Sequence, residues 1–417
     1  YRRQRQMCIR DRSNSRFLGD ALNKSVESVT WLGSDNDLQP RSRESLDVQT
    51  HASLERNAGS INDFANSIRA MRRHEIERIG LGWMSGVIDD KASLAGMTDV
   101  YDAAIDASLT WAIRHQTQEM GLDEAPAAIA VIGMGRYGGR EVNFSSDADV
   151  IIIYRPSDNA DDNQANLFAR KVQEDLRAIL QGPTTLEPKI ELDMDLRPEG
   201  KNGPLVRSYA SCEEYYRSWA STWEHQALLR ARYAAGDAAL AEDFLMNVAD
   251  PLRYPKIDLT EAQVAEIRKL KARMEAERLP RGVRRDRHLK LGKGGLSDVE
   301  WTIQLLQLQH AGDNANLRVN GTMQALDELE RRKLVSAGDA VVLRRAWWMC
   351  TAARNGSYLW SGRVNQADIL QDDTYSLGGL AVYLGYDANR GQHFENDLLA
   401  VMRKARDVTE RLFYGLS

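Results

Sequence analysis

The most constraining feature of this chain is the stretch GMGRYGGREVNFSSDADVIII, residues 133–153. The apolar run AAIAVIG that leads into it predicts a buried strand ending in a glycine-rich turn. A second apolar run, DVIIIY, follows so soon that a second strand is expected directly after the turn. Asp147 and Asp149 open this run, and residues two apart in a strand point to the same face. The stretch therefore predicts two neighbouring strands with a pair of carboxylates at the start of the second.

Gly133, Gly135 and Gly138 also match the G-x-G-x-x-G fingerprint of a dinucleotide-binding turn. That motif requires a full helix after the glycines, and then a second strand whose ribose-binding acid stands at its far end. Here too few residues separate Gly139 from Asp147 for a helix and its loops, and the acids precede the apolar run. The order of the elements argues against a dinucleotide site.

The acidic pair indicates metal-dependent phosphate chemistry instead. Adjacent carboxylates repel each other unless a cation lies between them, and such hard oxygen ligands suit Mg²⁺, or Mn²⁺ as an alternative. A D-x-D pair can also be a solvated turn acid followed by a strand cap. Gly138 and Gly139 would let the backbone approach a nucleotide, which favours a ligand site. Ser145 and Ser146 would offer hydroxyls to a phosphate in the same turn.

A further acidic pair, Asp193 and Asp195, lies in the predicted strand KIELDMDLR. A third carboxylate from a neighbouring strand is what a two-metal nucleotidyl site requires, because two acids bridge both ions and the third holds the ion that activates the attacking hydroxyl. We expect Asp193 to fill this role, with Asp195 as the alternative on the same strand face.

Composition and charge narrow the class of protein. Of 417 residues, 43% are hydrophobic and 28% charged, which is ordinary for a soluble globular protein, and no window approaches the roughly 20 apolar residues of a membrane span. The net charge of -5 offers no general attraction for nucleic acid. Cys8, Cys212 and Cys350 are widely spaced and odd in number, which suits a reducing compartment. We therefore expect a cytoplasmic protein that binds neither membranes nor nucleic acid and, lacking a heptad seam, is a monomer.

The pattern along the chain predicts an α+β fold: a small mixed sheet flanked by helices and followed by a C-terminal helical bundle. Residues 1–60 are interpreted as a leader and loose linker, because they are polar, weakly periodic and open on the basic YRRQRQMCIRDRS. Residues 61–122 show helical periodicity, residues 123–207 alternate strand and helix patterns, and residues 208–417 are dominated by amphipathic helices. Both acidic pairs thus fall in the α/β segment.

Four blocks in one order carry a family resemblance: GMGRYGGREVNFSSDADV, LDMDLRPEGKNGPLVRSYASCEEYY, WEHQALLRARYAAGD and LKLGKGGLSDVEWTIQLLQLQH. Together they resemble the bacterial glutamine synthetase adenylyltransferases, which are similar to the DNA polymerase beta-like nucleotidyltransferase superfamily. The resemblance covers roughly residues 60–417 and implies that residues 123–207 form a nucleotidyltransferase domain.

The resemblance implies an enzyme that transfers AMP from Mg-ATP to a tyrosine hydroxyl of glutamine synthetase, releases pyrophosphate and so regulates nitrogen assimilation. The family joins two similar halves, of which the N-terminal one removes AMP by phosphorolysis and the C-terminal one adds it. This chain has one set of catalytic blocks, lying behind long helices, and ends soon after LFYG, so we expect the adenylylating half. Phosphorolytic removal of AMP, or docking onto the synthetase without catalysis, stay open as alternatives. A nitrogen-status regulatory protein is a further expected partner.

Carried onto this sequence, the resemblance places the catalytic, metal-binding acids at Asp147, Asp149 and Asp193. Arg197 and Lys201 follow on the exit loop of the predicted strand, where they would neutralise triphosphate charge. Arg197 is the residue that we expect to bind the nucleotide.

The block KLGKGGLSDVE predicts a helix start. Ser297 followed by Glu300 forms a capping-box pattern, and Lys290 and Lys293 precede it in a glycine-rich segment. Cations beside the positive end of a helix dipole can hold a phosphate, so Lys293 is expected to bind the nucleotide.

Other conspicuous side chains are interpreted as structural. Tyr215, Trp219 and Trp223 recur every four residues, which predicts one helix with an aromatic stripe in the core, with a base-stacking platform as the alternative. His225 and His288 lack the spacing of a metal site and are interpreted as structural or exposed.

Overall fold

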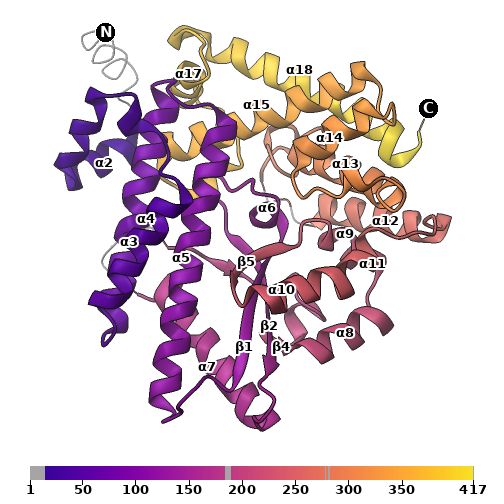
Figure 1. The fold of residues 1–417 in the computed structure, drawn as a ribbon. Helices are drawn as coiled ribbons and strands as arrows, with labels where there is room; N and C mark the ends of the chain where they lie inside the picture. Colours follow the sequence, from indigo (N-terminus) through magenta and orange to yellow (C-terminus); the bar gives the residue numbers. More distant parts are fainter. Residues whose placement is uncertain (1–14, 184–188, 278, 280–281, 417) are drawn as a thin grey trace.

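The computed structural model describes residues 15–183, 189–277, 279 and 282–416. It is mostly helical with one small five-stranded mixed sheet, which confirms the predicted α+β fold. The basic opening segment and Cys8 lie outside the described residues. In Figure 1 the N-terminal helices stand on the left, the sheet lies low in the centre and the C-terminal helices fill the upper right.

The five strands form one sheet in the order β3-β2-β1-β5, with β4 also paired to β2. β1 runs antiparallel to β2 and β5, whereas β2 runs parallel to β3 and β4. The two central strands match the predicted apolar runs, but only two residues of the predicted strand KIELDMDLR join the sheet. The strands are β1 (Ala127–Gly133), β2 (Ala148–Pro156), β3 (Leu192–Asp193), β4 (Val206–Ser208) and β5 (Arg232–Gly236).

Alternate residues of β1 face two different helical layers. Ile129 and Val131 belong to the core shared with α4, α5 and α7. Ala130 and Ile132 belong to the core shared with α8, α10 and η4. Because both faces of the strand are buried, the sequence shows a continuous apolar run instead of a polar–apolar alternation. These elements are α4 (Ile61–Met84), α5 (Asp90–Glu119), α7 (Asp162–Gln181), α8 (Tyr209–Ser218), α10 (Ala238–Phe244) and η4 (Leu245–Ala249).

The described part of the predicted loose linker is helical and packed. Ser15 and Ser42 cap its two α-helices by accepting hydrogen bonds from backbone N–H groups. Leu18, Leu38 and Leu46 are buried in the core that α4 and α5 share. Helices that are distant in the sequence bury these few apolar residues, and the stability gained from this burial is not visible in the local periodicity. The elements are α2 (Arg16–Lys24), η1 (Val26–Gly33), η2 (Asn36–Leu38) and α3 (Arg43–Arg56).

The C-terminal helices carry a core of their own around α15, which packs against α13, α14, α17 and α18. The far end of α15 also contacts the N-terminal helices, where Ser15 Oγ donates a hydrogen bond of 2.5 Å to Leu359 O. The elements are α12 (Glu261–Glu277), η5 (Arg285–Arg287), α13 (Leu296–His310), η6 (Ala315–Leu317), α14 (Thr322–Arg331), α15 (Ala337–Ser361), α16 (Val364–Ala367), α17 (Thr374–Tyr383), η7 (Ala388–Arg390), α18 (Gly391–Thr409) and η8 (Glu410–Tyr414).

The region after residue 207 contains a strand besides the predicted helices. After α9 (Thr222–Leu228) the chain returns to the sheet as β5 and then covers it with α10, η4 and α11 (Asp250–Arg253). The sheet therefore draws β5 from the segment in which helices were predicted to dominate.

The prediction that one helix carries an aromatic stripe was wrong. Tyr215, Trp219 and Trp223 do not share one helix, because α8 ends at Ser218 and α9 begins at Thr222. Trp219 lies between the two helices with 76% of its surface exposed. A break of three residues is enough to turn every later side chain away from the expected face.

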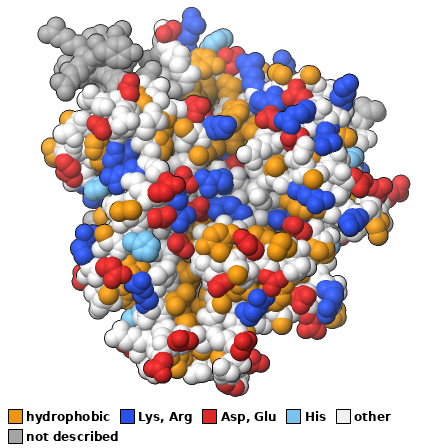
Figure 2. Space-filling model, in the orientation of Figure 1, with side chains coloured by type: hydrophobic (Ala, Val, Ile, Leu, Met, Phe, Trp, Pro, Cys, Tyr) orange, Lys and Arg blue, Asp and Glu red, His pale blue; other side chains and the backbone are white. Residues whose placement is uncertain are grey.

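Among the described residues, no helix is long and apolar enough to cross a membrane. On the face shown in Figure 2, acidic and basic side chains are interspersed and do not form separate fields. An anionic ligand must therefore be held by local groups, which directs attention to the cavities.

Candidate active site

The turn after β1 brings the backbone against a carboxylate. Gly135 opens the short helix α6 (Gly135–Gly138) with a φ of +51°. A Cβ at Gly135 would lie 2.1 Å from Oδ2 of Asp149. Only glycine accommodates both this left-handed backbone and this close approach. Gly135 thus makes room for Asp149.

The sheet register places the two predicted acidic strands side by side. Asp149 of β2 is paired directly with Asp193 of β3 in a parallel ladder. Asp147 precedes β2 by one residue, and its side chain is exposed. Asp193 Oδ1 also accepts a hydrogen bond of 2.8 Å from the backbone N of Asp195. Three carboxylates therefore surround the start of β2.

Asp149 has an unusual electrostatic environment. Burial raises its pKa to about 7, and the neighbouring charges of Asp147 and Asp193 contribute to this rise, while Lys290 acts in the opposite direction. A cation between these hard oxygen donors would relieve the repulsion, so the donor set suits Mg²⁺ or Mn²⁺. The described residues nevertheless contain no group of three His, Cys, Asp or Glu side chains arranged to hold a metal ion.

The acids line two different cavities. Asp147 and Asp193 line a cleft of about 660 Å³ together with polar side chains of α7. Asp149 and Gly135 line a larger cavity of about 900 Å³ between the sheet region and the C-terminal helices. The structure therefore brings the three predicted catalytic acids together at one end of the sheet, but not into one cavity.

Gly138 and Gly139 pack against the protein itself. A Cβ at Gly138 would lie 2.0 Å from the carbonyl O of Arg230, and a Cβ at Gly139 would lie 2.5 Å from its Nη1. Neither glycine is among the described residues that line the two cavities. Ser145 and Ser146 donate from Oγ to Asn143 Oδ1 at 3.1 and 2.8 Å. Their roles as nucleotide ligands stay predictions.

Arg197 is buried and braces the loop after β3. Its guanidinium donates to the carbonyl oxygens of Gly203, Met194 and Lys201, at 2.9, 2.8 and 3.2 Å. The loop includes η3 (Gly200–Asn202). Asp195 is exposed and lies 3.2 Å from Lys201 Nζ, so the alternative third acid is already paired with a cation. Asp193, opposite Asp149, has no such ion pair among the described residues.

The lysine of the glycine-rich block that reaches the larger cavity is Lys290. Lys293 is exposed and is not among the described residues that line this cavity. The predicted capping box is also absent, because α13 begins at Leu296 after Gly295. Glu300 instead forms an ion pair with Arg136, whose Nη1 lies 3.0 Å from Oε1 of Glu300. Arg136 stands within the glycine motif, a position that could have suggested a role at the site.

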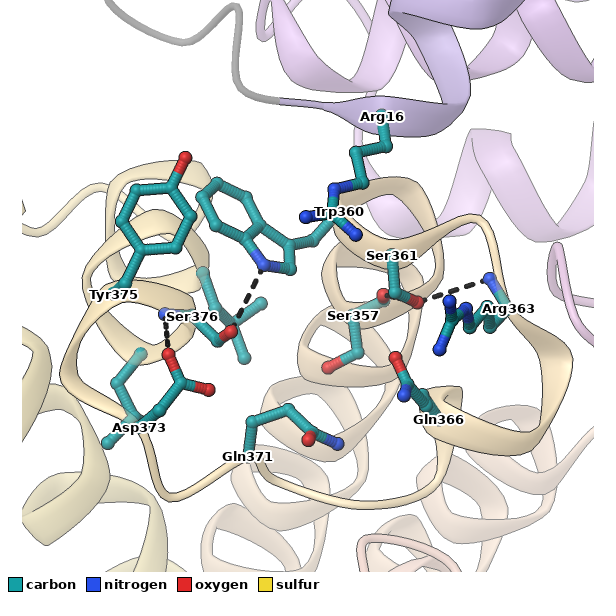
Figure 3. Close-up of a pocket in the computed structure, with 12 residues that line it drawn as sticks. Arg16, Ser357, Trp360, Ser361, Arg363, Gln366, Gln371, Asp373, Tyr375 and Ser376 are labelled. Carbon is teal, nitrogen blue, oxygen red and sulfur yellow. Dashed lines mark hydrogen bonds between the residues drawn. The ribbon is translucent and has the colours of Figure 1, made fainter.

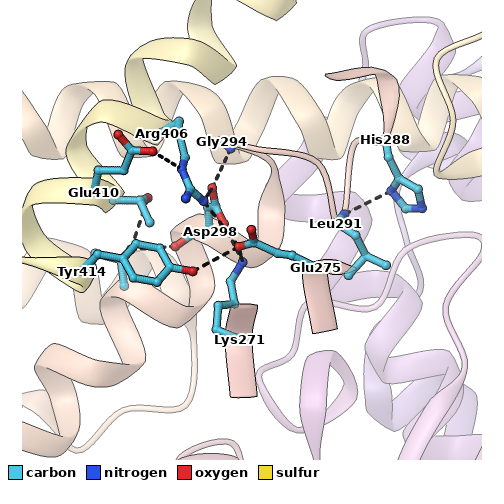
Figure 4. Close-up of polar contacts among 11 residues, drawn as sticks. Lys271, Glu275, His288, Leu291, Gly294, Asp298, Arg406, Glu410 and Tyr414 are labelled. Atoms are coloured by element: carbon cyan, nitrogen blue, oxygen red, sulfur yellow. Dashed lines mark hydrogen bonds and ion pairs between the residues drawn. The ribbon is translucent and has the colours of Figure 1, made fainter. Parts of the chain in front are cut away.

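A buried ionic network supports the glycine-rich block from behind (Figure 4). Asp298 is fully buried, and its carboxylate lies 2.6 Å from Lys271 Nζ and 3.1 Å from Arg406 Nη1. It also accepts a hydrogen bond of 2.7 Å from the backbone N of Gly294. Burial alone would raise the pKa of Asp298, but the two cations outweigh burial and lower it. The loop before α13 is therefore tied to α12 and α18.

A smaller cavity of about 210 Å³ lies among α2, α15 and α17 (Figure 3). Trp360 Nε1 donates to Ser376 Oγ at 3.3 Å, and Asp373 accepts from the backbone N of Ser376 at 2.8 Å. None of the three predicted catalytic acids is among its described lining residues. The predicted catalytic acids therefore line the two cavities beside β2 and not this one.

Two family models match successive parts of the chain. A family model described as glutamate-ammonia ligase adenylyltransferase matches residues 7–247, which include all five strands. A second model, described as PII-uridylyltransferase, matches residues 265–413 in the C-terminal helices.

Curated relatives match along nearly the whole chain. A bifunctional glutamine synthetase adenylyltransferase/adenylyl-removing enzyme of Bifidobacterium longum is 79% identical over 97% of this chain and 38% of its own length. Proteins of the same name from Leifsonia xyli and Streptomyces avermitilis are 42% and 39% identical over 97% of this chain, and over 39% and 41% of their own lengths. The chain thus spans about two-fifths of the curated relatives it matches.

Proposed function

Because this chain belongs to the glutamate-ammonia ligase adenylyltransferase family of nucleotidyltransferases, we propose that it transfers AMP from ATP to a tyrosine hydroxyl of glutamine synthetase. The observation that supports this reaction is the pairing of Asp149 with Asp193 beside Gly135, since it gathers carboxylates where a nucleotide cavity begins. The larger cavity is the proposed nucleotide site.

Asp147, Asp149 and Asp193 are the proposed ligands of Mg²⁺, with Mn²⁺ as the alternative; a bound divalent ion would supply positive charge to the phosphates and lower the pKa of the attacking hydroxyl. The protein positions the two substrates. The tyrosine oxygen forms a bond to the α-phosphorus, while the bond from that phosphorus to the bridging oxygen of pyrophosphate breaks. The carboxylate of Asp193 accepts the phenolic proton in the cleft of about 660 Å³ that Asp147 and Asp193 line.

The first test is the reaction itself. This chain is incubated with unmodified glutamine synthetase, Mg²⁺ and ATP, and the intact mass of the synthetase is measured, with Asp147→Asn as the control. A gain of AMP that the control lacks is the expected result. A gain that persists in Asp147→Asn would contradict the proposed acids.

The direction of transfer needs its own assay, because the relatives are named for both adenylylation and adenylyl removal. The chain is mixed with adenylylated synthetase and phosphate, and ADP is measured. Release of ADP without any forward transfer would assign the reverse activity. Binding of the synthetase without turnover in either direction would indicate a docking fragment. A nitrogen-status partner, a monomeric state and a cytoplasmic location stay predictions.

A further inference from the structure

The ring of His288 presents a donor to the larger cavity. His288 is only 3% exposed, and its Nδ1 accepts hydrogen bonds from the backbone N of Lys290 and Leu291 at 3.3 and 3.1 Å. A nitrogen that accepts carries no proton, so the neutral ring bears its hydrogen on Nε2. Nε2 has no hydrogen-bond partner among the described residues, and His288 lines the cavity. The wall of the cavity thus carries a donor that can bind an acceptor on a ligand.

Lys290 brings a positive charge to the same cavity. Its side chain makes no hydrogen bond or ion pair with any described residue, yet its charge acts on Asp149. Two carboxylates of this cavity have other partners, because Glu300 pairs with Arg136 and Asp368 pairs with Arg354. Asp149 lines the cavity as well, but no ion pair joins it to Lys290. The ammonium group is therefore available for an anion from outside the protein.

Arg136 adds a third donor. Its Nη1 pairs with Glu300 at 3.0 Å and its Nε donates to the carbonyl O of Glu141 at 3.2 Å. Its Nη2 is buried and has no partner among the described residues. The guanidinium also lies over the ring of Trp347, at 5.5 Å from the centroid, so its orientation is held on several sides.

We propose that Lys290, His288 and Arg136 bind the β- and γ-phosphates of the nucleotide, the part that leaves as pyrophosphate. The inference rests on the proposed function, because it divides the larger cavity between the two ends of ATP. The same cavity is also lined by Trp223, Leu270, Met274 and Trp301, whose apolar surfaces suit a base more than a phosphate. The triphosphate then extends toward Asp149.

The first experiment compares two lysines of one loop. The affinities of the whole chain for ATP, pyrophosphate and AMP are measured by calorimetry in Mg²⁺ for Lys290→Met and for the matched control Lys293→Met. Loss of one charge-assisted contact should weaken ATP and pyrophosphate binding about tenfold or more in Lys290→Met and leave AMP binding within about twofold. Lys293→Met should leave all three affinities within about twofold.

A pair of His288 variants separates ligand binding from loop structure. His288→Asn keeps an acceptor near the Nδ1 position but removes the outer donor, whereas His288→Gln keeps a donor near the Nε2 position. His288→Asn should weaken ATP binding more than His288→Gln, with thermal melting of both close to the parent chain. Equal affinity losses that follow equal losses in melting temperature would overturn the role of His288.

Two results would overturn the phosphate assignment as a whole. One is a Lys290→Met chain that binds ATP as tightly as the parent chain, which leaves the proposed reaction intact. The other is an equal loss of ATP and AMP affinity, which would place Lys290 at the base or ribose. A parent chain that binds neither ATP nor pyrophosphate would contradict the proposed function itself.

Discussion

Asp149 is partly buried and Asp298 is fully buried, and their surroundings are opposite. Asp149 lies among Asp147 and Asp193, and its pKa is raised to about 7 by burial and by these like charges. Asp298 lies between Lys271 and Arg406, and its pKa is lowered because the cations outweigh burial. The first carboxylate is surrounded by like charges, whereas the second has two cationic partners within the chain.

This contrast distinguishes a carboxylate that is proposed to act in the reaction from one that holds the fold together. A cluster of like charges costs stability, and in the proposed reaction a bound cation would relieve this repulsion. A buried carboxylate with two cations serves instead to hold elements together, here the loop before α13 with α12 and α18. The two aspartates should therefore respond differently to the same substitution.

Asp149→Asn carries the largest expected effect. Removal of one proposed metal ligand should lower AMP transfer by a factor of about 10³ or more, because the charge at the α-phosphate is no longer neutralised. The melting temperature should stay level or rise, because a like charge is removed. Intact-mass analysis of glutamine synthetase and a thermal melt measure the two effects. An Asp149→Asn chain that still transfers AMP would contradict the assignment of this acid.

Asp298→Asn should act on stability instead. It leaves Lys271 and Arg406 buried without their counter-charge, so the free energy of unfolding should fall by about 3–5 kcal/mol. Urea denaturation measures the change. Asp286→Asn is the matched control, because Asp286 pairs with Arg284 at the surface and its loss should cost less than about 1 kcal/mol. Equal losses in the two variants would remove the distinction between buried and exposed pairs.

Gly135→Ala tests how tightly the turn is built around Asp149. The added Cβ combines a positive φ with a clash against the carboxylate, so we expect a loss of about 2–4 kcal/mol in unfolding free energy and a loss of transfer. Gly121→Ala is the control, because Gly121 has a φ of +65° but open space around its Cβ position. Chemical denaturation measures the loss of unfolding free energy in both variants, and a larger loss in Gly135→Ala reports the clash. Equal losses would contradict the clash.

Glu77 is a further buried carboxylate, and its substitution carries the smallest expected effect. Burial within α4 raises its pKa from 4.5 to about 7. Its contribution to stability is therefore complete below pH 4.5 and is lost as the pH rises through 7. Glu77→Gln should be about 1–3 kcal/mol more stable than the parent chain at pH 8, with no advantage at pH 4. Denaturant unfolding across this pH range measures the difference, and a constant offset would contradict the pKa shift.

The sequence predicted the parts of the site that depend on local order. The strands β1 and β2 follow directly from two apolar runs, and the period of two puts Asp147 and Asp149 at the start of the second. Residues 15–56 were harder, because short polar helices gain their stability from caps and from distant helices. Trp219 was misplaced because a helix break between Ser218 and Thr222 is not visible in the aromatic spacing.

The sequence by itself thus determined the family resemblance, the α+β class and the identity of the acidic residues, since all of these rest on residue type and short spacing. Only the tertiary structure decided that Asp193 pairs with Asp149, that β5 closes the sheet edge and that Lys290 reaches the larger cavity in place of Lys293. Those outcomes depend on packing between segments more than one hundred residues apart in several cases, as with Arg136 and Glu300. Such contacts follow from the burial of whole surfaces, and no local pattern encodes them.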